Sequence, residues 1–358
     1  MKMLLAAALL AAAVGSGVAS TPTNSKALFR SATKSGQVGG EVPHPRQGSW
    51  ANTSLPAMPT ARCGLAAVAI NNTLYAVGGI SGGSGDNLTY VSTLEAFDPA
   101  TRTWDSSLPD MPSKRAYVAA VAINNVLYVV GGQDANGNYL DTLEAFDPAT
   151  RKWDRSLPSM STRRTMSAAV AINDVLYVVG GSAGDGIFLD TLEAFDPATE
   201  KWDRSLPSMS TNRVGLAAVA INNVLYAVGG EDGNGNYLDT LEAFDPATRK
   251  WDRPRGGWGR SKKRSYLAAV AISNVLYAVG GDNDDGFLGT LEAFDPATRQ
   301  WDRSLPSMST ARTGLAAVAI NNVLYAVGGY DRGEDGNGNS LDTLEAFDPA
   351  TRKWDRSH

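Results

Sequence analysis

Short hydrophobic segments separated by polar turn residues fill most of the chain. Residues 216–221 form a continuous apolar run, which is typical of a strand buried on both faces. Asn222 and Asn223 follow, and they favour a tight hairpin because asparagine tolerates the positive φ that such turns need. Residues 225–230 give a second strand ending in two glycines, where another backbone segment can approach closely. The pattern therefore predicts an antiparallel hairpin.

Two further strands follow in the same unit. After a variable loop, residues 240–244 predict a third strand. Residues 245–248 read Asp-Pro-Ala-Thr, a turn in which the fixed φ of proline suits the second position. Residues 250–253, which include Trp251, begin an outer strand. Since no segment shows a sustained helical period, the fold class is predicted to be all-β.

This four-strand unit occurs six times. Its glycine pairs begin 48 to 53 residues apart, and a tryptophan closes each unit. The pairs begin at Gly78, Gly131, Gly180, Gly229, Gly280 and Gly328, and the tryptophans are Trp104, Trp153, Trp202, Trp251, Trp301 and Trp354. A period of about 50 residues is typical of Kelch repeats.

The repeated residues resemble the Kelch family over nearly all of the chain, from about Trp50 to Trp354. The shared features are a glycine pair after a hydrophobic strand, an aromatic residue before Asp-Pro, and a tryptophan shortly after that aromatic. The resemblance implies a six-bladed β-propeller with four antiparallel strands per blade around a channel. The expected organisation is a signal peptide at 1–20, a flexible leader at 21–48 and the propeller at 49–358.

The closure of the ring is left open by the sequence. The segment that begins at Trp50 matches the outer-strand segment that begins at Trp104, which gives seven outer strands for six sets of the other three. In a ring of six blades, either the Trp50 segment or the Trp354 segment completes the last blade. The alternative is a truncated seven-bladed protein. We favour six blades.

The first twenty residues indicate export. Lys2 supplies a positive charge, residues 4–14 are apolar, and residues 15–20 are small, which is the layout of a secretory signal peptide. The apolar run is about half of the ~20 residues that a membrane span needs, and no other stretch is long enough. We therefore expect a protein secreted to the extracellular space or the periplasm, without a membrane span. The leader is rich in Ser, Gly, Thr and Pro, as flexible segments are.

Composition narrows the choice of partners. The net charge of −5 argues against a general nucleic-acid binder. Cys63 is the only cysteine, so no intramolecular disulfide forms. Three N-x-S/T triplets, beginning at Asn52, Asn71 and Asn87, permit glycosylation in a eukaryotic secretory pathway without predicting it.

An arginine in every repeat is the strongest candidate for ligand binding. These residues are Arg62, Arg115, Arg164, Arg213, Arg264 and Arg312, each eight residues before the isoleucine that ends the inner strand. A ring of guanidinium groups near the channel mouth suits carboxylate or phosphate ligands. In Kelch-type ubiquitin-ligase adaptors, arginines at the corresponding position hold acidic peptides. The resemblance extends this role to these six residues alone. The structural alternative pairs them with the equally regular Glu95, Glu144, Glu193, Glu242, Glu292 and Glu345.

Two sets of loops carry further candidates. Residues 253–264 replace the usual Ser-Leu-Pro-x-Met connection with a basic segment around Trp258, which either docks an acidic partner or glycan or is merely solvated. The Asp/Asn/Gly loops at 134–138, 232–236 and 335–339 have oxygen side chains at alternate positions, as calcium loops do. The full calcium-loop pattern is absent, so we interpret them as turns and expect neither a metal nor a cofactor.

Enzymatic activity is not expected. The two histidines, His44 and His358, lie in the leader and at the last position, so serine or cysteine triads have no placed base. A galactose-oxidase-like copper site has no histidine ligands here either. The sequence predicts a binding or scaffold protein for an acidic peptide, protein or glycan. The alternative is a carbohydrate-active Kelch enzyme such as a sialic-acid mutarotase; actin binding fits poorly with export.

Overall fold

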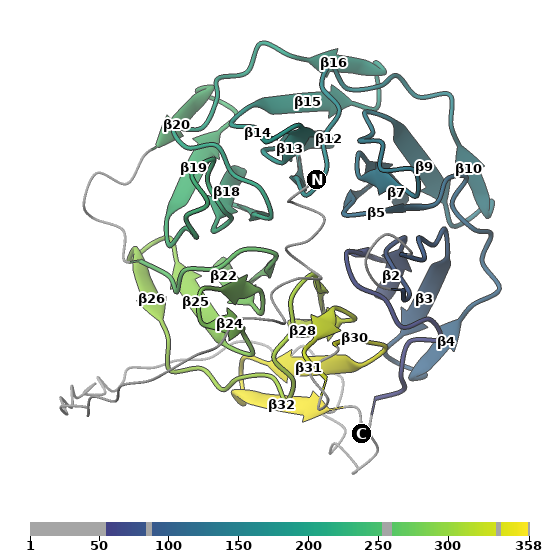
Figure 1. Ribbon diagram of the computed structural model, residues 1–358, viewed down its shortest axis with the longest axis vertical. Helices are drawn as coiled ribbons and strands as arrows, with labels where there is room; N and C mark the ends of the chain where they lie inside the picture. The colour runs from purple at the N-terminus through teal and green to yellow at the C-terminus, as the bar shows by residue number, and fades with distance from the viewer. Residues whose placement is uncertain (1–54, 84–87, 253–259, 334–337, 357–358) are drawn as a thin grey trace, which may run out of the picture.

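The computed structural model describes residues 55–83, 88–252, 260–333 and 338–356 (Figure 1). The predicted signal peptide (1–20), the predicted leader (21–48), Trp50 and Trp258 lie outside these residues. The described part is built from six four-stranded antiparallel sheets, arranged radially as the blades of a propeller. The all-β prediction and the six blades are confirmed. None of the described segments is a helix of the length and hydropathy that a membrane crossing requires.

Each blade uses one continuous stretch of chain, so blades 1 to 6 follow the sequence order. The inner strands, which line the channel, are β1 (Ala66–Ile70), β6 (Ala119–Ile123), β11 (Ala168–Ile172), β17 (Ala217–Ile221), β21 (Ala268–Ile272) and β27 (Ala316–Ile320). The second strands are β2 (Thr73–Val77), β7 (Val126–Val130), β12 (Val175–Val179), β18 (Val224–Val228), β22 (Val275–Val279) and β28 (Val323–Val327).

The third and fourth strands complete each sheet outward. The third strands are β3 (Leu94–Asp98), β9 (Leu143–Asp147), β15 (Leu192–Asp196), β19 (Leu241–Asp245), β25 (Leu291–Asp295) and β31 (Leu344–Asp348). The outer strands are β4 (Thr103–Asp105), β10 (Lys152–Asp154), β16 (Lys201–Asp203), β20 (Lys250–Asp252), β26 (Gln300–Asp302) and β32 (Lys353–Arg356).

The turns form as their residues predict. Asn222 and Asn223 have φ values of 50° and 62°, which fit the primed hairpin turns that match the twist of the strands. In the turn after β19, Asp245 accepts hydrogen bonds of 2.9 Å from the amide of Ala247 and the hydroxyl of Thr248. These turns lie at one end of the blades, which we name the turn face.

The opposite end, which we name the loop face, carries the loops between second and third strands and the connections between blades. The sequence predicted variable loops here, and among the described residues three of them contain small hairpins. The hairpins are β13 (Ser182–Gly184) with β14 (Ile187–Phe188), β23 (Asp282–Asn283) with β24 (Gly286–Phe287), and β29 (Tyr330–Asp331) with β30 (Asn339–Ser340). In blade 2, β5 (Arg115–Ala116), which precedes the inner strand, pairs with β8 (Gln133–Asp134), which follows the glycine pair. Strands of two or three residues are too short to show a hydrophobic period.

The core lies between neighbouring blades. The aromatic residue before each Asp-Pro turn is fully buried, as Phe244 is at 0% exposure, and packs on the tryptophan of its own outer strand with ring centroids 5.2 Å apart. Phe244 also joins the hydrophobic cluster of the preceding blade, which includes Tyr177 and Val179. The Phe–Trp pair therefore seals one blade against the next, since burying such large aromatic surfaces is strongly stabilising.

The Trp354 segment completes the last blade, because β32 pairs with β31 of its own repeat. The N-terminal segment has another role. Met58 donates its amide to the carbonyl of Asp342 at 2.7 Å, and Trp104 donates Nε1–H to the carbonyl of Pro56 at 3.2 Å. Elsewhere, the proline that accepts from the tryptophan belongs to the connection that leaves the preceding blade, as Pro109 does for Trp153. At the boundary between blades 6 and 1, residues 55–62 thus occupy the place that this connection has elsewhere.

Candidate functional site

Sequence variation among the repeats is concentrated on the loop face. The inner strands all read Ala-Ala-Val-Ala-Ile, and the third strands all read Leu-Glu-Ala-Phe-Asp. The turn face carries Asp-Pro-Ala-Thr in every copy. Residues that follow the glycine pairs differ in every copy. Since binding residues are usually carried on variable loops held by a rigid scaffold, the loop face is the candidate binding face.

The six repeated arginines lie under the loop face, with 0–2% of their surface exposed. Each one pairs with the glutamate of the third strand in its own blade. The Nη2 to carboxylate distances are 2.6 Å for Arg62–Glu95, 2.9 Å for Arg115–Glu144, 2.6 Å for Arg164–Glu193, 2.9 Å for Arg213–Glu242, 3.0 Å for Arg264–Glu292 and 2.5 Å for Arg312–Glu345. The structure therefore shows the pairing that the structural alternative expected.

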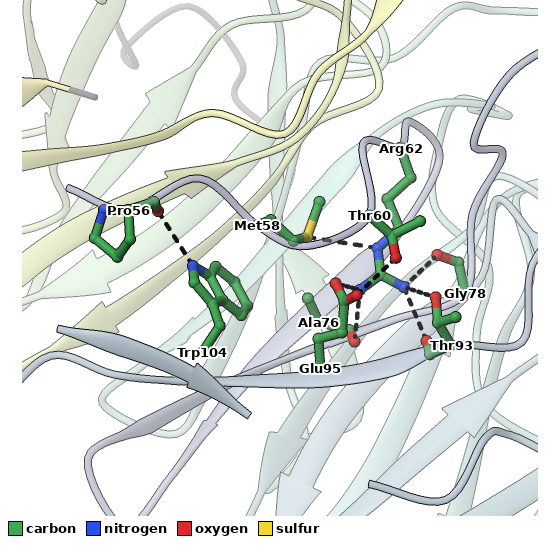
Figure 2. A network of polar contacts seen from close by, with 9 residues as sticks. All are labelled: Pro56, Met58, Thr60, Arg62, Ala76, Gly78, Thr93, Glu95 and Trp104. Carbon is green, nitrogen blue, oxygen red and sulfur yellow. Dashed lines mark hydrogen bonds and ion pairs between the residues drawn. The ribbon is translucent and has the colours of Figure 1, made fainter. Parts of the chain in front are cut away.

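Figure 2 shows how completely one of these guanidinium groups is used. Beside its bond to Glu95, Arg62 donates from Nη1 to the carbonyl of Gly78 at 3.2 Å and to the carbonyl and hydroxyl of Thr93 at 2.8 and 2.6 Å. The other oxygen of Glu95 accepts from the hydroxyl of Thr60 at 2.6 Å. A buried charge is tolerated only when its hydrogen-bonding groups are satisfied in this way.

The main chain at the repeated arginines joins neighbouring blades. The amide of Gly79 donates to the carbonyl of Arg115 at 2.9 Å, and a Cβ at Gly78 would lie 2.6 Å from that oxygen. The equivalent bond recurs around the ring and closes where Gly329 donates to Arg62 at 2.9 Å. This close approach explains the glycine pair. Ligand binding by the six arginines stays a prediction, and their burial supports the structural role.

The other sequence candidates have mixed placements. Trp258 lies outside the described residues. At the end of the same basic segment, Arg260 pairs with Asp239 at 3.1 Å and keeps 73% of its side chain exposed. In the Asp/Asn/Gly loops, Asp134 accepts from the amides of Asn136 and Asn138 at 2.9 Å, as a turn requires. Asp232 has the same role in its loop. The described residues contain no group of three or more acidic, Cys or His side chains placed to hold a metal ion.

A ring of residues that the sequence analysis missed surrounds the channel mouth on the loop face. It lies two residues after each repeated arginine and consists of Gly64, Tyr117, Met166, Gly215, Tyr266 and Gly314, which we name the collar. Each amide donates to the carbonyl of the preceding collar residue over 2.6–3.0 Å, and Gly64 closes the circle by donating to Gly314. The collar therefore links all six blades by backbone hydrogen bonds alone.

All collar residues adopt left-handed backbone conformations. Glycine does so readily, but Tyr117, Met166 and Tyr266 have φ values of 55°, 54° and 50°. Bulky residues rarely take this conformation, and it costs about 1–3 kcal/mol each. Because three of the copies keep glycine, the large side chains are not needed to form the ring. Strain of this kind concentrates at functional sites. The signal in the sequence was the variation itself, two residues after an arginine that is the same in every repeat.

The large collar side chains lie against one another and against the small members. A Cβ at Gly64 would touch the ring of Tyr117 at 3.0 Å, so that ring covers Gly64. The hydroxyl of Tyr266 lies 3.2 Å from the sulfur of Met166. Burial raises the pKa of both tyrosines well above its ordinary value. The phenols therefore remain neutral.

A second ring of aromatic residues lies outside the collar, on the returning strands of the loop-face hairpins. Its members are Tyr90, Tyr139, Phe188, Tyr237 and Phe287. Each is paired with the residue after its own glycine pair, as Tyr237 is with Glu231. Beside Phe188, Ile187 is 56% exposed, the one exposed large hydrophobic side chain among the described residues. The collar and this ring give the loop face an aromatic centre.

Beneath the collar, the channel contains a cavity of about 270 Å³. One valine and one alanine from each inner strand line it, and these are Val68, Ala69, Val121, Ala122, Val170, Ala171, Val219, Ala220, Val270, Ala271, Val318 and Ala319. The lining offers no polar side chain for recognition or catalysis, and it has near-sixfold symmetry. The asymmetric chemistry lies at the channel mouth.

Comparison with known proteins agrees with this architecture. The family model described as the KLHDC2/KLHL20/DRC7 Kelch-repeats domain matches residues 42–212 and again residues 168–358. The solved structure named "Structure of YjhT" is similar with a TM-score of 0.70 over 85% of this chain and 99% of that chain. At 17% sequence identity, this likeness shows a shared fold alone. Because the two matches of the family model together span most of the sequence, the chain belongs to the Kelch-repeat family that this model describes.

Proposed function

We propose that this Kelch propeller is a secreted, non-enzymatic binding protein whose ligand, a peptide, protein or glycan, contacts the collar on the loop face. A binding or scaffold role is general among Kelch propellers. The observation that carries the site is the strained conformation of Tyr117, Met166 and Tyr266, which the ring itself does not need. Export is supported by the layout of residues 1–20.

The collar suits recognition for a physical reason. Aromatic side chains give large, rigid contact surfaces at a low cost in conformational entropy, and they dominate the energetics of many binding surfaces. Two tyrosines and a methionine among three glycines also break the sixfold symmetry of the ring. An asymmetric centre can fix the orientation of one ligand, whereas the guanidinium groups below are already occupied by glutamates and carbonyl groups.

The experiment is a peptide and glycan array probed with the mature chain and with a variant that carries Tyr117→Gly, Met166→Gly and Tyr266→Gly. Glycine is the residue that the chain itself uses at the other collar positions, so the variant relieves strain and should fold. The matched control is Asn223→Gly, which also places glycine at a positive φ but on the turn face.

We expect the array ligand to bind the parent and the control and to lose at least tenfold in affinity for the collar variant. Equal binding by all three proteins would contradict the proposal. A sialic-acid anomer-interconversion assay on the same proteins covers the alternative: turnover by the parent would replace the binding proposal with the mutarotase.

A further inference from the structure

Carboxylates gather on the loop face where blades 4 and 5 meet. Glu231 and Asp282 occupy the position directly after the glycine pair in these two blades, where the other copies have Ile80, Gln133, Ser182 and Tyr330. Asp284 follows two residues later. Together with Tyr237 and Tyr266, these carboxylates form what we name the acidic corner.

The side chain of Asp282 lies in this corner beside the hydroxyl of Thr313, which favours its charged form. The residue is 8% exposed, and neither its buried Oδ1 nor that hydroxyl has a partner at hydrogen-bond geometry. The equivalent residue between blades 1 and 2 is Gln133, which accepts a hydrogen bond from Tyr90 of the preceding blade at 3.2 Å. An unsatisfied buried carboxylate oxygen is rare and expensive, so it calls for a ligand group that completes it.

The neighbouring boundary shows what such a group can be. Between blades 5 and 6, the guanidinium carbon of Arg332 lies 5.6 Å from the ring centroid of Phe287. Phe287 corresponds to Tyr237, and Arg332 corresponds to Asp284, which stands three residues after the glycine pair of blade 5. At the acidic corner, Tyr237 supplies the aromatic ring, but the carboxylate of Asp284 stands where the neighbouring boundary has the cation of Arg332.

Backbone pairing brings the members of the corner together: Glu231 pairs with Tyr237, and Asp282 pairs with Ser265, the residue before Tyr266. Their charges therefore act on one another. Burial, and then the charge of Asp282, raises the pKa of Tyr237 and of Tyr266. Burial, and then Glu231, raises the pKa of Asp282 to about 7. For Glu231, the pKa is raised by burial first and then by Asp232 and Asp284. Two crowded carboxylates beside aromatic faces attract a cation by charge and by the ring quadrupole.

We propose that the acidic corner binds a positively charged side chain of a peptide ligand, with Asp282 as its ion-pair partner and Tyr237 and Tyr266 as its aromatic walls. This inference rests on the proposed function, because it assigns ligand chemistry to one edge of the collar. It also departs from the acidic ligand that the arginines suggested. A lysine or arginine side chain supplies both the charge and the hydrogen-bond donors that Asp282 Oδ1 lacks.

The probe is the peptide acetyl-Gly-Gly-Lys-Gly-Gly-amide, titrated by NMR against the full chain. Matched peptides replace lysine with arginine, norleucine or glutamate. We expect the lysine and arginine peptides to bind, and the norleucine and glutamate peptides to bind at least tenfold more weakly. Arginine binding without lysine binding would restrict the site to guanidinium groups, and it would still support a cation.

The variant Asp282→Asn keeps the shape of the side chain and removes its charge, so it should weaken the lysine peptide at least tenfold, and Glu231→Gln several-fold. The control is Asp174→Asn on the turn face, which removes one charge and restores the asparagine of the other repeats. A melting curve checks that each variant is folded. Absence of binding by both the lysine and the arginine peptide, equal binding of the norleucine peptide, or full binding by folded Asp282→Asn would each overturn the inference.

The two proposals fail differently. If an array ligand depends on the collar glycine substitutions but is indifferent to Asp282→Asn, the collar is a binding site and the acidic corner is not its cation site. If the collar substitutions change nothing, the proposed function itself fails.

Discussion

The amide of Gly64 donates a hydrogen bond of 2.8 Å to the carbonyl of Gly314, and this contact joins the first blade to the last. Gly329 and Arg62 form a second such link at 2.9 Å. Neither link exchanges a strand between blades, because every sheet is built from a single repeat. The propeller therefore closes through backbone contacts at the loop face and through the packing of residues 55–62 on blade 6.

Closure by residues 55–62 predicts a sharp boundary for truncation. A chain that begins at residue 54 should keep the melting temperature of the mature protein, whereas one that begins at residue 63 should lose stability strongly. The longer deletion removes buried Leu55 and Met58 together with Arg62. Differential scanning calorimetry of both truncations measures this, and equal melting temperatures would show that the ring closes without the segment.

Two adjacent arginines carry the same charge but differ in burial, so their substitution tests the effect of burial on stability. Arg164 is fully buried and pairs with Glu193, whereas its neighbour Arg163 is exposed and donates to the carbonyl of Ala183 at 3.1 Å. Arg164→Ala should lower the free energy of unfolding by about 3–5 kcal/mol, because it leaves an uncompensated buried carboxylate. Arg163→Ala should change it by less than about 0.5 kcal/mol. Urea unfolding gives both values, and similar small losses would point to a ligand-facing Arg164.

Glycine substitutions distinguish steric contact from backbone strain. A Cβ at Gly131 would lie 2.5 Å from the carbonyl oxygen of Arg164, whereas a Cβ at Gly186 would meet nothing within 4 Å, although its φ is also positive at 77°. Gly186→Ala should therefore cost only the strain of about 1–2 kcal/mol. Gly131→Ala should cost clearly more, since the backbones of two blades must separate. Equal losses in chemical denaturation would refute this reason for the glycine pair.

The raised pKa of Asp282 predicts a pH-dependent stability. Burial, and then Glu231, moves its pKa from 3.8 to about 7 in the folded chain. Since the folded state holds this proton more tightly than the unfolded state, the favourable contribution is complete below about pH 4 and is lost as the pH rises through 7. Asp282→Asn has no such loss. Its melting temperature relative to the parent should rise between pH 4 and 7, and a constant difference would argue against a raised pKa.

Cys63 should be slow to react in the native protein. Burial raises the pKa of its thiol above the ordinary value of 9.0, so the thiolate that reacts with disulfide reagents is scarce. Labelling with Ellman's reagent at pH 8 should be much slower in the folded chain than in urea. Equal rates would mean that the Cys63 environment opens readily.

The repeat pattern carried most of the fold, because each blade repeats the same hydrophobic strands and turn residues. Asn222 and Asn223 adopt the positive φ values that their identities predict. The pattern could not decide between a paired and a ligand-facing Arg213, since Glu242 recurs with the same period and the direction of a side chain is not encoded in spacing. Pro56 accepts the hydrogen bond of Trp104, and the spacing of these two residues in the sequence does not show that they meet.

The collar was beyond sequence reasoning for a different reason. Tyr117 and Tyr266 stand out from Gly64 and Gly215 as differences between otherwise similar copies. Their meaning depends on a left-handed backbone, and only the structure supplies that conformation. The small hairpins that bring Asp282 beside Tyr237 were hidden likewise, because a two-residue strand has no period to detect.

Each blade is built from one uninterrupted stretch of chain, so the order of the blades along the chain can be changed by design. The first and last described segments, residues 55–62 and β32, meet at one boundary between blades, and any other boundary is an equivalent place to open the ring. A gene cut after Asp203 and rejoined from Arg356 to Leu55 by a short linker should give the same propeller with new termini. By the same logic, duplication of one repeat would add a whole blade, and the strands of the other blades would stay unchanged.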